Sequence, residues 1–255
     1  MTHRRLANML FALAALTLLL GLALGGGDGR SRIPLPLRML SSLLVWCAAL
    51  LLWRGAQGPG RARAARAAAG MGLGFLGDLV MARVIRLPQH ILFGMLAFGA
   101  GHAQYIRGAL LIRGEHGGHG ERSAYGRSVQ RPNGESEGPA LRGLWDARAE
   151  LLAAAGIGAA GWRMLVYGPQ QPPVITYAAL AYSLLLSAVP GIGVALARRD
   201  PRRTPLALGG TLFLLSDLIL AGELFRELSF PHIGDVIWLT YLAGQGLIVY
   251  GIDRD

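Results

Sequence analysis

The chain has 255 residues, of which 53% are hydrophobic and 16% are charged, and it carries a formal net charge of +10. This composition is too apolar for a soluble domain of this length, and its apolar residues gather in runs long enough to span a membrane. The positive charge comes from arginine alone. In a chain of this kind it indicates membrane topology rather than a nucleic-acid partner.

Eight apolar runs follow one another, each close to the roughly 20 residues that a membrane-spanning helix requires. We therefore predict an all-α, polytopic membrane bundle of eight helices that forms one integral membrane domain over residues 1–255. The first run could instead be a signal peptide, because Arg4 and Arg5 precede it, although it is longer than a typical h-region. The runs lie at about 6–24, 35–53, 65–83, 89–112, 149–167, 173–197, 205–225 and 233–252.

The connection between the fourth and fifth runs, at about 113–147, is rich in Gly, Ser and charged residues. This composition predicts a flexible cytoplasmic linker between a first half at about 1–112 and a second half at about 148–255. His116 and His119 lie within it at a spacing that resembles a weak metal pair, but their glycine neighbours favour a solvated loop.

Arginine is distributed unevenly between the two sides of the expected bundle. The N-terminus, the connections after the second, fourth and sixth runs, and the C-terminus carry most of it. Because cytoplasmic loops are enriched in arginine, we predict a multi-pass protein of the cell membrane with both termini in the cytoplasm. The opposite side carries only Arg30, Arg32, Arg38, Arg83, Arg86 and Arg226.

The two halves look like a repeat. The stretch FLGDLVMA at 75–82 aligns with LLSDLILA at 214–221, and each is followed by a proline that lies fourteen residues before a polar residue, His102 or Gln245. The third and seventh runs cross in the same direction, so this predicts two parallel four-helix repeats related by an axis along the membrane normal.

Four polar side chains fall at one level of the expected bundle, each within roughly 5 Å of the midplane at about 1.5 Å per residue. Because an aspartate at a helix centre costs roughly 3 kcal/mol, such groups should face the bundle interior and have partners there. One such residue is often only an interhelical hydrogen-bond partner, whereas several at one depth favour a functional site. The four are Asp78, His102, Asp217 and Gln245, with Tyr105 on the face of His102 and Ser216 beside Asp217.

Four short motifs are ordered along both halves: Gly77-Asp78, the H-x-x-Y of His102 to Tyr105, Ser216-Asp217, and the AGQ-x-LI of Ala243 to Ile248. As a set they resemble the bacterial YhhN and animal TMEM86 lysoplasmalogenase family, which has eight predicted spans. Characterised members of that family hydrolyse the vinyl-ether bond of lysoplasmalogens. The resemblance implies a lysophospholipid substrate. By this resemblance the family's acidic motif residues correspond to Asp78 and Asp217, its H-x-x-Y to His102 and Tyr105, and its late glutamine to Gln245.

Vinyl-ether hydrolysis needs a proton donor and a nearby negative charge. Two carboxylates in a low dielectric tend to share one proton, so Asp78 and Asp217 would offer one acid and one anion, and which is which stays open. His102 and Tyr105 would orient the pair or a water. Gln245 and Ser216 would bind water or substrate, although a helix hydroxyl such as that of Ser216 usually bonds back to its own backbone.

Other interpretations stay open at this point. The reaction requires no cofactor or metal, but two aspartates and a histidine could be metal ligands. Midplane carboxylates in a repeated bundle also suit a proton-coupled transporter, and a non-catalytic lipid-binding membrane protein is a third class. The partners expected are a lysophospholipid, water and membrane lipid, with the oligomeric state open. Asp235 is expected only to cap the last helix.

Overall fold

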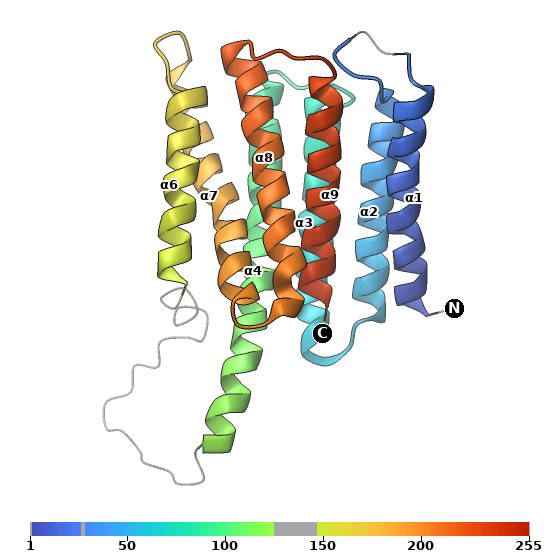
Figure 1. Cartoon of the computed structure of the whole chain (residues 1–255), viewed down its shortest axis with the longest axis vertical. Helices are drawn as coiled ribbons and strands as arrows, with labels where there is room; N and C mark the ends of the chain where they lie inside the picture. The colour runs from blue at the N-terminus through green and yellow to red at the C-terminus, as the bar shows by residue number, and fades with distance from the viewer. Residues whose placement is uncertain (1, 27–28, 125–146, 255) are drawn as a thin grey trace.

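The computed structural model describes residues 2–26, 29–124 and 147–254, the side chains of 113–124 excepted, and the regular structure of this part is all helical. Eight α-helices stand side by side in an elongated bundle, and both termini lie at the same end (Figure 1). The elements are α1 His3–Leu24, α2 Leu35–Gly55, α3 Gly58–Met81, α4 His90–Ala124, α6 Arg148–Leu165, α7 Pro173–Ala197, the 3-10 helix η1 Pro201–Arg203, α8 Thr204–Arg226 and α9 Ile233–Asp253.

Six of the helices are long and apolar enough to cross a membrane, namely α1, α2, α3, α7, α9 and α8 together with η1. The other two, α4 and α6, stand beside them in the same bundle (Figure 1). Each of the eight overlaps one of the predicted apolar runs. The prediction of a polytopic all-α membrane bundle is therefore confirmed.

Proline marks the start of several helices. α2, α3, α7 and α8 each carry a proline in their first two positions. At that place the missing N–H costs no hydrogen bond and the fixed φ already suits the helix. These prolines therefore help to set where each chain crossing begins.

The predicted start of the linker is wrong. α4 does not end near Ile112 but continues as a helix to Ala124. Once a helix has formed, each further residue adds a hydrogen bond at small cost, so the helix can outlast the apolar run that nucleated it. The rest of the predicted linker, 125–146, lies outside the described residues.

The two halves pack in the same order. α1 packs on α2, α2 on α3 and α3 on α4, and likewise α6 on α7, α7 on α8 and α8 on α9. α3 and α8, which carry the aligned aspartates, run in the same direction (Figure 1). This is the arrangement that a parallel repeat requires, and the rotation that would superpose the halves stays a prediction.

Glycines hold the α3–α4 and α8–α9 hairpins close. A Cβ on Gly101 would lie 2.8 Å from the Gly70 carbonyl oxygen, and a Cβ on Gly244 would lie 2.9 Å from the Gly209 carbonyl oxygen. Gly70 and Gly101 correspond to Gly209 and Gly244 when the alignment of the two halves is extended to them. The same close backbone approach is thus built twice, as in other membrane helix pairs with small residues at the interface.

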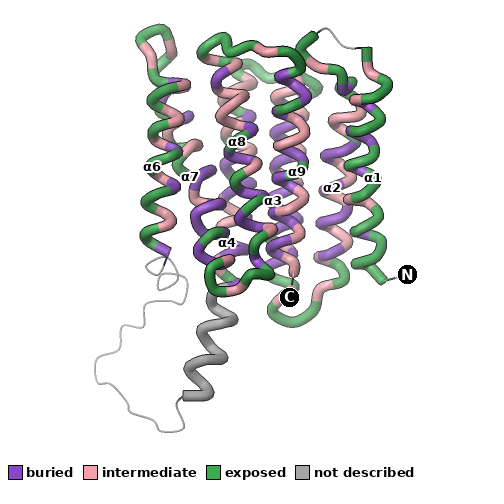
Figure 2. Tube along the Cα trace, in the orientation of Figure 1, coloured by how far each residue is buried: buried purple, intermediate pink, exposed green. Residues whose placement is uncertain are grey.

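The outer surface is apolar and the interior holds the polar groups. Exposed residues cover the outward faces of helices such as α1 and α6, and buried ones gather where the helices meet (Figure 2). Large apolar side chains such as Leu19 and Met164 are exposed, whereas Asp78, His102 and Gln245 are buried. This pattern suits a lipid environment, in which polar side chains are kept inside the bundle.

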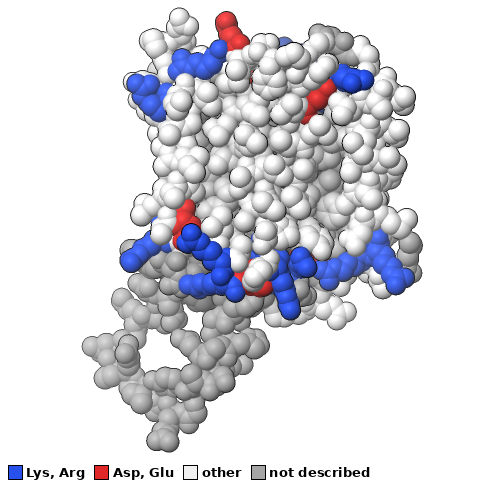
Figure 3. Space-filling model, in the orientation of Figure 1, with Lys and Arg blue, Asp and Glu red and all other residues white. Residues whose placement is uncertain are grey.

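Charge separates along the bundle. On the face shown in Figure 3, arginines form a band at the end that holds both termini, few occur at the other end, and the zone between is apolar. By the positive-inside tendency we predict that the end with both termini faces the cytoplasm.

We therefore expect a reporter fused after Asp255 to be active only in the cytoplasm. A fluorescent protein at this position should fluoresce, and alkaline phosphatase at the same position should be inactive. The matched control carries each reporter in the α3–α4 connection, after Arg86. At this position the phosphatase should be active and the fluorescent protein should not fluoresce. Phosphatase activity at the C-terminus would reverse the assigned orientation.

Candidate functional site

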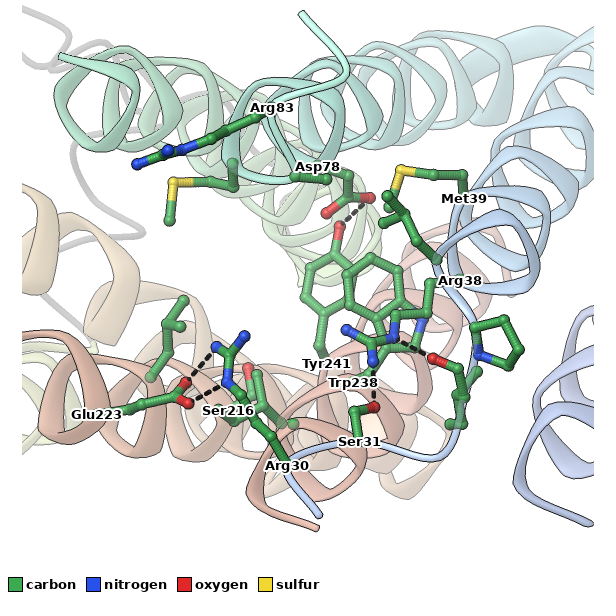
Figure 4. A pocket seen from close by; sticks show the side chains of 18 of the residues that line it. Arg30, Ser31, Arg38, Met39, Asp78, Arg83, Ser216, Glu223, Trp238 and Tyr241 are labelled. Carbon is green, nitrogen blue, oxygen red and sulfur yellow. Dashed lines mark hydrogen bonds and ion pairs between the residues drawn. The ribbon is translucent and has the colours of Figure 1, made fainter. Parts of the chain in front are cut away.

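A cavity of about 750 Å³ enters the bundle at the end away from the termini. Its mouth is formed by the α1–α2 connection, by the ends of α3 and α8 and by the starts of α4 and α9. Asp78 and Asp217 both line it (Figure 4 shows Asp78). The structure thus brings together the two aspartates that the sequence singled out.

Asp78 is buried on α3, with 3% of its surface exposed. Its Oδ2 accepts hydrogen bonds from Ser42 Oγ of α2 at 2.5 Å and from the Tyr241 hydroxyl of α9 at 2.9 Å. Hydroxyl donors from two neighbouring helices therefore fix the carboxyl group at the cavity wall. Hydrogen bonds of this kind are what permit a carboxyl group to be buried in a membrane bundle.

A chain of hydrogen bonds runs from Asp78 deeper into the bundle. The Tyr105 hydroxyl donates to Gln245 Oε1 at 2.5 Å, and Gln245 Nε2 donates to the Tyr241 hydroxyl at 3.2 Å. A Cβ on Gly74 would lie 2.7 Å from Gln245 Nε2, so a glycine makes room for the amide. Because Tyr241 in turn donates to Asp78, every donor in the chain points toward the carboxylate.

Asp217 stands on α8 and is half-buried. Its Oδ2 accepts a hydrogen bond of 2.5 Å from the Tyr182 hydroxyl of α7. Ser216 Oγ lies 3.4 Å from Asp217 Oδ1, but its shorter bond, at 2.7 Å, goes to the Phe213 carbonyl oxygen of its own helix. Ser216 lines the cavity, and its hydroxyl is engaged by the backbone rather than set up as a nucleophile.

His102 is buried beside this site rather than on the cavity wall. Its Nδ1 bonds the Phe98 carbonyl oxygen at 2.8 Å, so Nδ1 must carry the proton. Its ring packs edge-on against Phe213, with ring centroids 4.4 Å apart. Within the described residues, Nε2 is buried without a hydrogen-bond partner. A buried acceptor in this state is a place for a water or a substrate atom.

The sequence prediction is matched only in part by these contacts. His102 and Tyr105 were expected to orient the aspartates or a water, and none of the hydrogen bonds found in the described residues joins either of them to an aspartate directly. Tyr105 reaches Asp78 only through Gln245 and Tyr241. Its role is therefore indirect.

Three hydroxyl partners were missed: Ser42, Tyr182 and Tyr241. For the two tyrosines the sequence did contain a signal, because a tyrosine hydroxyl in the middle of an apolar helix needs a hydrogen-bond partner. What the sequence could not supply was the neighbour that each hydroxyl meets. The mouth arginines were also missed, because they were assigned to topology alone.

The mouth of the cavity is strongly basic. Arg30, Arg32, Arg38 and Arg83 line it, and Arg30 forms a two-pronged ion pair with the carboxylate of Glu223 (Figure 4). Arg38 is held differently. Its Nε donates to the Ile33 carbonyl oxygen at 2.8 Å and its Nη2 donates to Ser31 Oγ.

Asp235 builds this mouth and does not cap its own helix, so the expected role is wrong. One carboxylate accepts from Ser31 Oγ at 2.5 Å, from the Arg32 N–H at 2.8 Å and from the Ile33 N–H at 3.0 Å. The side chain therefore ties the α1–α2 connection to the start of α9 and supports the serine that holds Arg38. The carboxylate thus bonds a segment distant in sequence instead of the N–H groups of its own helix.

A metal site is not assembled from the candidate ligands. In the described part of the chain, no three His, Cys, Asp or Glu side chains lie together as a metal site would require. Asp78, Asp217 and His102 therefore do not form the ligand set that their residue types allowed.

For the hydrolase that the four motifs led us to expect, Tyr241→Phe should lower turnover about tenfold, because the hydroxyl that it removes donates to Asp78 and accepts from Gln245. The rate should be measured on purified protein at saturating substrate. Tyr177→Phe is the matched control, because Tyr177 is 65% exposed on α7. Equal rates for the two variants would remove Tyr241 from the site.

Comparison with known proteins gives one match. The sequence model described as YhhN family matches residues 36–252, which contain every residue that lines the large cavity except Leu35 and those of the loop before α2. No curated protein and no solved structure matches the chain. The family match agrees with the resemblance that the four motifs carried.

Proposed function

Since the chain belongs to the YhhN family, which includes lysoplasmalogenases, we propose that it hydrolyses the vinyl-ether bond of a lysophospholipid to a fatty aldehyde and a glycerophospho-headgroup. One observation carries this proposal. Asp78 and Asp217 line the same cavity of a membrane bundle, and each is fixed by a hydroxyl donor. A pair of carboxyl groups of this kind can supply the acid and the base that the reaction needs.

The reaction begins when one carboxylic acid gives its proton to the vinyl carbon farther from oxygen. The double bond is consumed, and the carbon next to oxygen becomes part of an oxocarbenium ion. Water adds to that carbon while the other aspartate takes the proton that the water loses. The hemiacetal then collapses, breaking the carbon–oxygen bond to give the aldehyde and a free headgroup hydroxyl, so one water is consumed overall.

The surroundings of the aspartates suit the charge that develops. The anionic aspartate lies near the oxocarbenium ion as the second carboxylate does in glycosidases. Aromatic rings of Phe98, Trp238 and Tyr241 line the same cavity and provide electron-rich walls for a cation. Gln245 and Tyr105 position Asp78 through Tyr241, Ser216 lies beside the substrate path, and His102 Nε2 is a place for the attacking water.

The test is product analysis with purified protein and a panel of lysolipids. Alkenyl lysolipids should release a free aldehyde, whereas alkyl-ether and acyl lysolipids of equal chain length should release none. Aldehyde release from no alkenyl lysolipid would overturn the proposal. Proton-coupled uptake of a solute into proteoliposomes, without aldehyde release, would favour a transporter in its place.

A further inference from the structure

A second, narrow cavity of about 80 Å³ lies between α4, α6, α7 and α8. Its lining is apolar apart from a few side chains, among them Asp217 and Tyr182. We call it the α4–α8 crevice. It shares five lining residues with the large cavity, so the two meet along one wall. The shared residues are Met81, Phe98, Asp217, Leu220 and Leu224.

The crevice lies where the helix packing of the second half differs from that of the first half. The backbones of α3 and α9 pack against each other, but those of the corresponding pair, α8 and α4, stay apart in the described residues. α8 and α4 meet through side chains such as Phe213 and His102, and the backbones of both pack on α7. Small residues such as Gly161 and Ala221 line the space that results. The wall beside Asp217 is therefore open to an apolar group, whereas Asp78 borders the large cavity but not the crevice.

The opposite end of the large cavity is built to meet an anion. Arg38 is half-buried there, and the backbone of Ile33 and the side chain of Ser31 fix its guanidinium group. Ser31 is in turn fixed by Asp235 of α9. A guanidinium group that is already oriented binds phosphate well, because little side-chain freedom is lost on binding.

From these two ends we propose a binding mode that rests on the proposed function: the lysolipid places its phosphate at Arg38 and the first methylenes of its hydrocarbon chain in the α4–α8 crevice, with the ether group between them beside Asp217. The proton must reach the vinyl carbon on the hydrocarbon side of the double bond. Asp217 borders both cavities, so it is the acid that donates this proton. Asp78, on the polar side, takes the proton from water.

The phosphate contact is tested by binding, with saturated alkyl-ether ligands that the reaction cannot cleave. One ligand carries glycerophosphate and its partner carries glycerol alone. Arg38→Gln should weaken binding of the phosphate ligand on the order of tenfold, because a charge-assisted hydrogen bond is lost, and this loss should disappear with the glycerol ligand. Arg107→Gln, at an exposed site on α4, is the control and should not discriminate between the ligands.

An equal loss for both ligands would show that Arg38 only supports the fold, and would overturn the phosphate contact. Inorganic phosphate separates the two possible sources of the anion. If it binds the wild type as tightly as the lysolipid does, the mouth is a site for free phosphate and the binding mode is wrong. Weaker binding of inorganic phosphate supports a lipid ligand.

The chain contact is tested with Ala221→Phe, which places a ring in the crevice. Its loss of affinity should grow with the length of the alkyl chain while the added methylenes still fall within the crevice, reach the order of tenfold and then level off, because each buried methylene contributes to binding. Ala243→Phe is the control, since Ala243 is exposed on α9 and lies outside the crevice. A loss that is independent of chain length would overturn the placement of the chain.

These binding results are separate from catalysis. If the variants behave as expected but alkenyl lysolipids release no aldehyde, the binding mode stands and the proposed function fails. If aldehyde is released but Arg38→Gln and Ala221→Phe discriminate neither headgroup nor chain length, the function stands and the binding mode fails.

Discussion

Replacing Asp217 with asparagine is expected to reduce the rate of aldehyde release at least ~10²-fold, the low end for a positioned acid–base group. Asparagine keeps the size of the side chain and an oxygen that can accept from Tyr182, but it has no acidic proton to give to carbon. Asp78→Asn should have a loss of similar size, because it removes the group that takes the proton from water in the proposed mechanism. The measurement is kcat on purified protein in detergent.

The double variant separates a catalytic pair from two independent residues. If Asp78 and Asp217 act as a unit, the double variant should be little worse than the worse single one. Glu227→Gln is the control, because this carboxylate is exposed at the end of α8 and borders neither of the two cavities described. Near wild-type aldehyde release from either aspartate variant would sink the assignment.

Gly244→Ala is expected to destabilise the bundle by about 1–3 kcal/mol, the usual range for overpacking. The added Cβ would lie 2.8 Å from the Phe213 nitrogen and 2.9 Å from the Gly209 oxygen, and both are backbone atoms of α8 that can yield only if the helices separate. Since α8 carries Asp217 and α9 carries Gln245 and Tyr241, activity should fall as well.

The control for this substitution lies two residues further along the same helix. A Cβ on Gly246 would have nothing nearer than 3.8 Å, so Gly246→Ala should leave the thermal unfolding temperature unchanged or slightly raised. Gly101→Ala, at the corresponding place in α4, should resemble Gly244→Ala because its Cβ would lie 2.8 Å from the Gly70 oxygen. Equal unfolding temperatures for Gly244→Ala and Gly246→Ala would show that the hairpins are not held by this contact.

The helical architecture was predictable because each helix depends on a local sequence pattern. Apolar runs of membrane-spanning length mark each helix, and an ionisable residue such as Asp78 or Asp217 inside one of them indicates the site. The matched spacing of the two halves also indicated that these two residues occupy related helices. Both lie on the wall of one cavity.

The detailed contacts of the site could not be predicted. They depend on which helix faces pack against each other, and local sequence patterns do not determine this. Tyr182 and Tyr241 resemble any other aromatic residue in an apolar run until α7 and α9 are seen beside the aspartates. Asp235 lies in the first turn of α9, where a helix cap is expected. Its carboxylate instead accepts hydrogen bonds from the α1–α2 connection, which is distant in sequence. The open α4–α8 crevice is a departure from the repeat, so the repeat itself could not predict it.

The central claim is that an aspartate in this cavity protonates carbon, and hydrolysis in heavy water tests it most directly. Purified protein acts on an alkenyl lysolipid in D₂O, the aldehyde is trapped by reduction as it forms, and its mass is measured. We predict one deuterium on the carbon next to the former aldehyde carbon, formed at a rate that falls at least ~10²-fold in Asp217→Asn. An aldehyde product without that deuterium, or labelled product formed as fast by Asp217→Asn as by the wild type, would contradict the account.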